Sequence, residues 1–168
     1  MLASAIIDRV TIILQDESNV RWPRAELLKW LNDAQREIVM ARPDSLAENA
    51  TITLVAGTKQ SIPNTAIQLL DVVRNTSGRA IRVVSREIMD AQQPDWHTQT
   101  QSGTIKHYMF DVRDPKHFYV YPPATVGTTV EAVYSTAPAE VTSESGAISL
   151  NDVYTNAIVD YVLYRSYL

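Results

Sequence analysis

The fold is decided by residues 22–54, WPRAELLKWLNDAQREIVMARPDSLAENATITL, in which the spacing of apolar side chains changes from helical to extended. Pro23 suits the first position of a helix and Pro43 ends the helical pattern, so the spacing predicts a helix over about residues 23–42. From about residue 50 onward apolar and polar residues alternate, which is typical of a half-buried strand. The stretch therefore predicts a helical segment that leads into a β-rich one.

The segment before this helix is also helical in its periodicity. Apolar residues recur three or four positions apart until the polar run at residues 16–19, which predicts an amphipathic helix. The apolar stripes comprise Leu2, Ile6, Val10, Ile13 and Leu14 in the first helix, and Leu27, Leu31, Ala34 and Ile38 in the second. Lys29 and Asp33 are spaced as an ion pair on the polar side of the second helix. The short connection favours an antiparallel helical hairpin.

Residues 50–135 contain short runs that are typical of strands, separated by glycine, proline and asparagine turns. The expected strands cover residues 51–54, 60–63, 67–74, 80–84, 107–112, 117–121 and 128–135. Ser85 is expected to cap a short helix over residues 86–93. Pro115 suits a type I turn at residues 113–116, so the strands on either side of that turn are expected to form a hairpin.

A last helix is expected from about Asn151 to Leu168. Val159 and Leu163 fall opposite its main apolar side, so the helix is apolar nearly all round and is expected to be covered on both faces. Half of the chain's tyrosines lie in this segment: Tyr154, Tyr161, Tyr164 and Tyr167. Tyrosine is enriched at protein interfaces, but a core helix of the monomer explains the pattern equally well.

Together these segments predict an α+β fold, in which a helical bundle carries a β-rich insertion of antiparallel strands and one short helix. The N-terminal helical hairpin is expected in residues 1–48 and the insertion in residues 49–148. Residues 149–168 are expected to supply the C-terminal helix that completes the bundle, and the whole chain is expected to form one structural unit.

The composition excludes several classes of protein. A chain of 168 residues without cysteine has no disulfides, no thiolate metal sites and no cysteine nucleophile. Its 15 basic and 19 acidic residues give a net charge of −4, whereas a duplex-binding domain is usually basic. No apolar run approaches the roughly 18 residues of a membrane span, and the N-terminus is unlike a signal peptide. A soluble, intracellular protein with no membrane partner is expected.

Candidate interface residues come from two further features. Arg74, Arg79, Arg82 and Arg86 lie in a stretch without acids and could meet phosphate or carboxylate, although a solvated strand face is the plainer explanation. Trp96 lies in a polar loop, where it either clamps the loop or anchors a partner.

No catalytic, cofactor or metal site is predicted. The five glycines are scattered, so no phosphate-binding loop can be written, and GxSxG is absent. His97, His107 and His117 lie ten residues apart, a spacing that fixes no shared metal geometry on strands and loops. Asp111 and Asp114 flank a turn that needs such residues anyway. The chain is therefore expected to have no enzymatic activity, no cofactor and no metal.

Several stretches resemble the adaptor, or head-to-tail connector, proteins of tailed bacteriophages of the podovirus type. They are WPRAELLKWLNDAQREIV (22–39), LLDVVRN (69–75), RAIRVVSREIMDAQQPDWH (79–97), KHYMFDVRDPKHFYVYPP (106–123) and VYTNAIVDYVLYRSYL (153–168). The PDWH loop and the FDxRDPxxFYVYPP hairpin are the more specific of these motifs. Family members continue beyond the VLYRSYL helix, so the resemblance assigns no residue of this chain to portal docking.

The resemblance implies a structural virion protein. Its copies would form a homo-oligomeric ring, usually a dodecamer, that joins the portal protein at the capsid vertex to tail nozzle or tube proteins. The ring would line the channel for double-stranded DNA without binding a specific sequence and would serve genome ejection. The expected location is the head–tail interface of the virion, and the host cytoplasm during assembly.

Two other functions remain open from the sequence. A nucleic-acid-binding β module would use aromatic residues as stacking platforms and the four arginines as phosphate contacts. Its aromatic residues would be Tyr108, Phe110, Phe118, Tyr119 and Tyr121, although strand alternation places at least half of them in the core. A hydrolase that depends on Asp95 or His97 is the weaker option.

Overall fold

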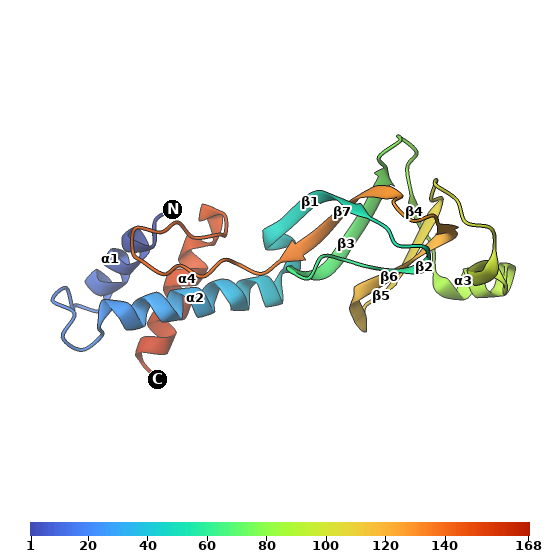
Figure 1. The fold of residues 1–168 in the computed structure, drawn as a ribbon. Helices are drawn as coiled ribbons and strands as arrows, with labels where there is room; N and C mark the ends of the chain where they lie inside the picture. Colours follow the sequence, from blue (N-terminus) through green and yellow to red (C-terminus); the bar gives the residue numbers. More distant parts are fainter. The chain divides into compact units, whose positions relative to one another are not determined.

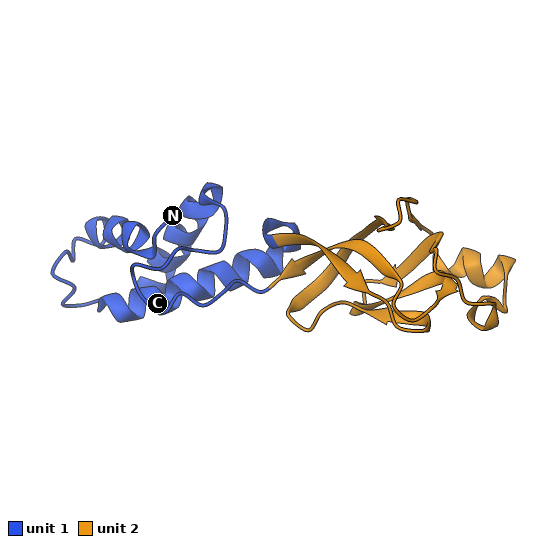
Figure 2. Cartoon of the chain, turned by 45° about the horizontal axis from the view of Figure 1, so that its top comes forward, with its two compact units in different colours: residues 1–46, 137–168 blue, residues 47–136 orange.

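The computed structural model describes residues 1–168 and divides them into two compact units. The helical unit comprises residues 1–46 and 137–168, and the β unit comprises residues 47–136 (Figure 2). Helices and antiparallel-rich sheets are thus largely segregated, which confirms the predicted α+β fold. Residues 137–148, which the sequence analysis grouped with the insertion, lie in the helical unit.

Three helices form the core of the helical unit: α1 (Ala3–Ile13), α2 (Arg24–Ala41) and α4 (Thr155–Ser166). Short 3-10 helices, η1 (Pro43–Leu46) and η3 (Asp152–Tyr154), follow α2 and precede α4 (Figure 1). The buried apolar side chains include Ile6, Ile7, Val10, Leu27, Leu31, Ala34, Val39, Ile158, Val159 and Val162. None of the helices combines the length and the apolar character that crossing a bilayer requires.

The apolar stripe predicted for α1 is partly wrong. Leu2 and Ile13 are 49% and 47% exposed, whereas Ala3 and Ile7 are buried. The reason is that consecutive apolar residues in this segment fit two neighbouring helical stripes equally well, and packing selects one of them. In α2, Ile38 is half-buried while Val39 is fully buried.

The predicted Lys29–Asp33 pair is also wrong. Lys29 lies 3.2 Å from the carboxylate of Glu26, and the carboxylate of Asp33 lies 3.1 Å from Arg36. Lys29 and Asp33 each have an oppositely charged residue three positions away, Glu26 and Arg36 respectively. Each of them pairs with that residue in place of the other.

Two buried amides on α2 hold the segment that returns from the β unit. The Asn32 side chain donates to the Val141 carbonyl at 3.0 Å and accepts from the Val141 N–H at 2.9 Å. The Gln35 carbonyl oxygen accepts from the Ser149 N–H at 2.8 Å. Residues 137–150 contain no helix or strand, so these side chains replace the backbone partners that regular structure would supply.

The same segment caps α1, which has no side-chain cap at its N-terminus. The N–H groups of Ala3 and Ser4 donate to the carbonyls of Gly146 and Glu144, each at 2.9 Å. These contacts satisfy two of the N–H groups that the first helical turn leaves unpaired.

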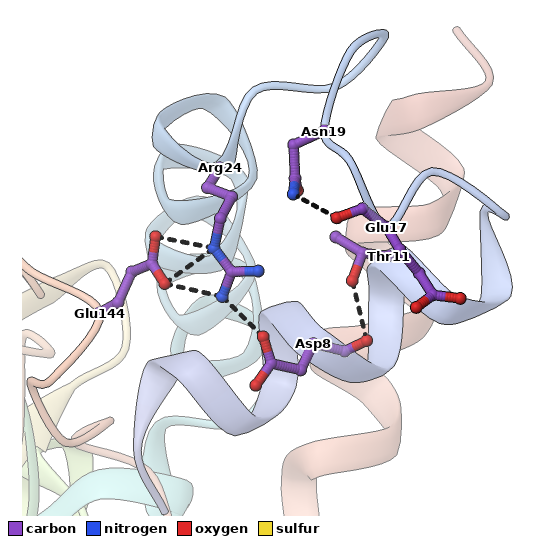
Figure 3. A network of polar contacts seen from close by, with 6 residues as sticks. All are labelled: Asp8, Thr11, Glu17, Asn19, Arg24 and Glu144. Atoms are coloured by element: carbon purple, nitrogen blue, oxygen red, sulfur yellow. Dashed lines mark hydrogen bonds and ion pairs between the residues drawn. The ribbon is translucent and has the colours of Figure 1, made fainter.

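Arg24, at the start of α2, links that helix both to α1 and to the returning segment 137–150 (Figure 3). Its Nε lies 2.9 Å from both carboxylate oxygens of Glu144, and its Nη2 lies 2.7 Å from Asp8 on α1. These hydrogen bonds, first to Glu144 and then to Asp8, raise the pKa of the Arg24 guanidinium above its ordinary value. A planar guanidinium suits such a shared site because its donors are fixed in a fork.

Asn32→Ala tests the role of the α2 amides. The substitution leaves the Val141 N–H and carbonyl buried without partners, so we expect a loss of about 1–3 kcal/mol in the free energy of unfolding. Urea denaturation followed by circular dichroism measures the loss, and Lys29→Ala on the exposed side of α2 is the matched control. Equal stability of the Asn32 and Lys29 variants would contradict this role.

The loop between α1 and α2 is organised by Asp16. Its carboxylate accepts from the N–H groups of Val20, Arg21 and Trp22 at 2.9–3.0 Å. These bonds, led by the one from Trp22, lower the pKa of Asp16. The charged form therefore stabilises the loop and the start of α2.

Asp16→Ala is expected to destabilise the protein near neutral pH and to matter less in acid. Because the folded pKa is lowered, the charged carboxylate contributes fully above the ordinary Asp pKa and loses its contribution as the pH falls through the folded value. Unfolding free energies measured between about pH 7 and pH 3 check this. Asp160→Ala, which removes an exposed carboxylate without a hydrogen bond or ion pair, is the control. A wild-type advantage that persists or grows in acid would contradict the assignment.

Two sheets form the β unit. The first has the order β1-β7-β3 and the second β2-β6-β5-β4 (Figure 1). All pairings are antiparallel except that of β4 with β5, which is parallel. The strands are β1 (Ala47–Thr53), β2 (Gly57–Ser61), β3 (Ala66–Asn75), β4 (Arg82–Val83), β5 (His107–Asp111), β6 (Asp114–Ala124) and β7 (Thr129–Thr136). Their buried faces share one apolar core that includes Leu69, Val72, Phe118, Val120, Val130 and Ala132.

The predicted β5–β6 hairpin is present, but its turn is misplaced in the prediction. Pro115 lies within β6 and the connection consists of Val112 and Arg113. The Asp111 carboxylate accepts from the Arg113 N–H at 2.9 Å and from its guanidinium, and these hydrogen bonds lower the pKa of Asp111 to about 2. This local Asp–Arg contact closes the turn two residues earlier than Pro115 suggested.

A small third core holds α3 (Arg86–Gln92) and the following 3-10 helix η2 (Trp96–Thr98) against the hairpin. Trp96 is completely buried, and its indole N–H donates to Asp90 at 2.9 Å. Its ring stacks on His97 and meets Tyr119 edge-on. Ser85 occupies the cap position of α3 but makes no side-chain cap bond, contrary to the prediction.

Candidate interaction surfaces

The C-terminal tyrosines divide into two groups. Tyr154 and Tyr161 are half-buried against the helical core, whereas Tyr164 and Tyr167 are 60% and 71% exposed. Val159 is buried on the inner side of α4, but the outer side that carries Tyr164 is not covered within this chain. The core-helix explanation therefore fits Tyr154 and Tyr161, whereas an interface role for the four tyrosines stays a prediction.

An aromatic surface lies at the end of α4, where Tyr164 and Tyr167 are exposed and Trp22 is half-buried against the helical core. Tyr167 meets Trp22 edge-on, with ring centroids 6.3 Å apart, and the Trp22 indole N–H donates to the Ser166 carbonyl at 3.1 Å. The guanidinium of Arg21 lies over the Trp22 ring, 4.5 Å from its centroid. Trp22, Tyr164 and Tyr167 are called the aromatic surface below. Exposed aromatic side chains of this kind are typical anchors of protein–protein contacts.

Trp96, the other aromatic candidate, is placed differently. Its complete burial leaves no ring surface for a partner in this conformation, and its contacts clamp the loop that follows α3. The chain thus uses Trp96 to hold α3 and η2 onto the hairpin.

The four arginines also separate into pairs. Arg74 binds Glu131 at 2.5 Å, and Arg86 lies 3.8 Å from Asp90, so each has a carboxylate partner in its own chain. Arg79 and Arg82 have none. The arginine stretch is therefore two neutralised side chains and two free ones.

Arg79 and Arg82 line a pocket of about 300 Å³ together with Lys106 and His107. The sequence analysis missed Lys106 and His107, because only the parallel pairing of β4 with β5 sets Arg82 opposite His107. We call these four side chains the cationic pocket. Burial and the neighbouring Arg82, Lys106 and Arg79 lower the pKa of His107.

Asn75 fixes the two segments that carry the cationic pocket. Its side chain donates to the carbonyls of Arg79 and Ile105, at 3.0 and 2.8 Å, and accepts from the Ile105 N–H at 2.8 Å. Asn75 is 1% exposed, and its two bonds to Ile105 are shielded from water. The tight turn from Asn75 to Arg79 needs Gly78, whose φ of +117° is unfavourable for other residues.

A second, larger hollow of about 490 Å³ lies between β4, the start of α3 and the β5–β6 hairpin. Its apolar rim includes Val83 and Val112, which are 60% and 74% exposed. Arg86 and Arg113 alternate there with Glu87 and Asp111, so its charges are balanced. No signal in the sequence analysis pointed to this groove.

The carboxylates of the chain are dispersed over both units, and its histidines all lie in the β unit. No three His, Asp or Glu side chains come together in the geometry of a metal site. The three histidines have separate neighbours: His97 bonds Thr58, His107 stacks on Tyr121, and His117 bonds Asp114. Of the five aromatic platforms expected for a nucleic-acid-binding module, Tyr108 and Phe118 are buried, Tyr119 and Tyr121 are half-buried, and Phe110 alone is exposed.

A comparison with protein families identifies the chain. The family model described as SU10 adaptor protein matches residues 1–168. The chain belongs to this family. No curated protein with which the chain was compared matches it.

Membership of the SU10 adaptor protein family confirms the resemblance to phage adaptors drawn from the sequence motifs. It indicates a bacteriophage structural protein, a virion component that interacts with other virion proteins, in a family that is typically non-enzymatic. For such an adaptor, the surfaces that matter are contact surfaces. The aromatic surface, the cationic pocket and the balanced groove are the three candidates that the structure offers.

Asn75→Ala is expected to destabilise the β unit of this adaptor by about 1–3 kcal/mol, because it leaves the Ile105 N–H and carbonyl without partners in the core. Denaturant unfolding monitored by hydrogen exchange of the Ile105 amide measures the effect. Ser77→Ala, two residues away on the exposed turn, is the control. Retained protection of that amide in the Asn75 variant would show that the frame of the pocket does not depend on this side chain.

Proposed function

We propose that this adaptor is a ring subunit that joins the portal protein at the capsid vertex to the tail nozzle or tube proteins and lines the channel for double-stranded DNA. The observation that carries the proposal is the match of the whole chain, residues 1–168, to the SU10 adaptor protein family. The proposed assembly is a homo-oligomeric ring, a dodecamer, formed in the host cytoplasm and retained at the head–tail interface. The role is structural, without catalysis.

The distribution of charge supports a passive conduit. The chain has a net charge of −4, and its helical unit contains more acidic than basic residues. A surface that passes DNA without holding it should not be strongly cationic, because phosphate contacts from Lys and Arg supply most non-specific DNA affinity. Two of the four arginines in the β unit that could make such contacts are already paired with carboxylates.

The surfaces of the helical unit support assembly with neighbours. Tyr164 and Tyr167 of the aromatic surface are both more than half exposed at one end of α4. An exposed cluster of large apolar and aromatic side chains is typical of a subunit that buries them in a complex. We assign this aromatic surface to contacts between ring subunits or with the portal.

Native mass spectrometry of the purified chain, alone and with the portal ring, tests the proposal. The expected result is a closed oligomer of the chain, either alone or on the portal. A chain that stays monomeric and never binds the portal would contradict it.

The variant Tyr164→Ala/Tyr167→Ala tests the aromatic surface in the same assay. Removal of two exposed anchors is expected to weaken assembly by about tenfold or more while the helical content is unchanged. Val153→Ala, which truncates an exposed apolar side chain just before α4, is the control and should assemble like the wild type. Normal assembly of the double variant would remove the aromatic surface from the interface.

A further inference from the structure

The cationic pocket is notable because its charges have no counterpart in the chain. Of the nine other arginines, six lie within 4 Å of a carboxylate, as Arg24, Arg74 and Arg113 do, and the three that do not are scattered singly in the helical unit. No carboxylate lies within 4 Å of the charged groups of Arg79, Arg82 or Lys106. Like charges held close together repel one another, so an arrangement of this kind is stabilised by an anion.

The backbone that carries the pocket is held by the fold. The Arg82 N–H donates to the Lys106 carbonyl at 3.1 Å, and the β4–β5 register sets Arg82 beside His107. The buried Asn75 binds the carbonyl of Arg79 and both backbone groups of Ile105. Both segments that carry the cations are therefore fixed at the backbone.

His107 is the fourth group of the cationic pocket. Its Nδ1 is buried and has no hydrogen-bond partner in the chain. Its ring stacks on Tyr121 of β6, and the charged groups that face it are all cationic: Arg82 on β4, Lys106 beside it and Arg79 on the turn. An anion that enters the pocket would therefore change the charge around this imidazole.

We infer that the cationic pocket binds a side-chain carboxylate from a second copy of this chain, supplied by that copy's helical unit. The inference rests on the proposed ring. The helical unit contains seven basic and eleven acidic residues, whereas the β unit contains eight of each. Glu17, Glu37 and Asp160 of the helical unit are exposed and have no cation partner in their own chain.

The shape of the pocket favours a protein carboxylate over the phosphates of a duplex. Duplex binding needs cations spread along a surface that follows the backbone, and several phosphates are contacted at once. Here the unpaired cations gather in one hollow of about 300 Å³, which suits a single anionic group on a side chain. An acidic chain is also a poor binder of DNA.

Charge reversal tests the inference in the full chain. Arg79→Glu/Arg82→Glu is expected to reduce ring formation by about tenfold or more, because like charges then meet across the contact. Lys59→Glu/Lys116→Glu changes the charge of the β unit equally and is the control, since neither lysine is paired or lines the pocket. Three rescue variants add Glu17→Lys, Glu37→Lys or Asp160→Lys to the pocket variant. One of the three is expected to restore ring formation, because it places a cation opposite the new glutamates.

The outcomes separate the pocket from the proposed function. If the pocket variant forms rings as the wild type does, the inference fails and the ring proposal stands. If the wild type forms no ring, the ring proposal fails, and the inference of a second-copy contact fails with it. Circular dichroism checks folding, and Arg79→Gln/Arg82→Gln replaces the reversed variant should that one not fold.

A direct measurement on the pocket itself uses the pKa of His107, followed by NMR in the isolated chain. Sodium acetate is expected to raise this pKa relative to sodium chloride at equal ionic strength, because a bound carboxylate favours the charged imidazole. The same pKa in both salts would overturn the inference. A short DNA duplex that raises it more than acetate does would assign the pocket to phosphate instead and would likewise overturn it.

Discussion

The rest of the structure depends on the two buried amides of α2. The helical unit is built from chain ends that are separated by the whole β unit, so its core is complete only when residues 137–150 return and are held. Asn32 and Gln35 hold them through backbone groups of Val141 and Ser149. The held segment then caps α1 and presents Glu144 to Arg24.

The same device recurs in the β unit. Asn75 supplies hydrogen bonds to irregular backbone between strands, as Asn32 does to the backbone of Val141 between β7 and α4. A buried amide suits this role because it offers both a donor and an acceptor without a charge that burial would penalise. The backbone that Asn75 fixes carries the unpaired cations of the cationic pocket. A rigid frame of this kind lowers the cost of binding a partner.

The sequence predicts the helices, most of the strands and the α+β class, because hydrophobic periodicity records which faces are buried. It misplaces details that depend on competition between neighbours. Asp111 and Arg113 close the hairpin before Pro115 can form its turn, and α1 buries Ile7 in place of Ile13. The cationic pocket lies beyond sequence reasoning, since Arg82 meets His107 only through a parallel pairing of two-residue length. Arg74 is paired and Arg79 is not, and this difference also lies beyond the sequence because the partner of Arg74 is Glu131, which is distant in the chain.

A single structural measurement tests the ring-forming adaptor most directly: electron cryomicroscopy of the full chain assembled on its portal ring. The account predicts a closed, symmetric ring around an open channel, with each copy in contact with its neighbours. Copies that bind the portal singly, without contacts to one another, would contradict it, as would a portal ring that carries none.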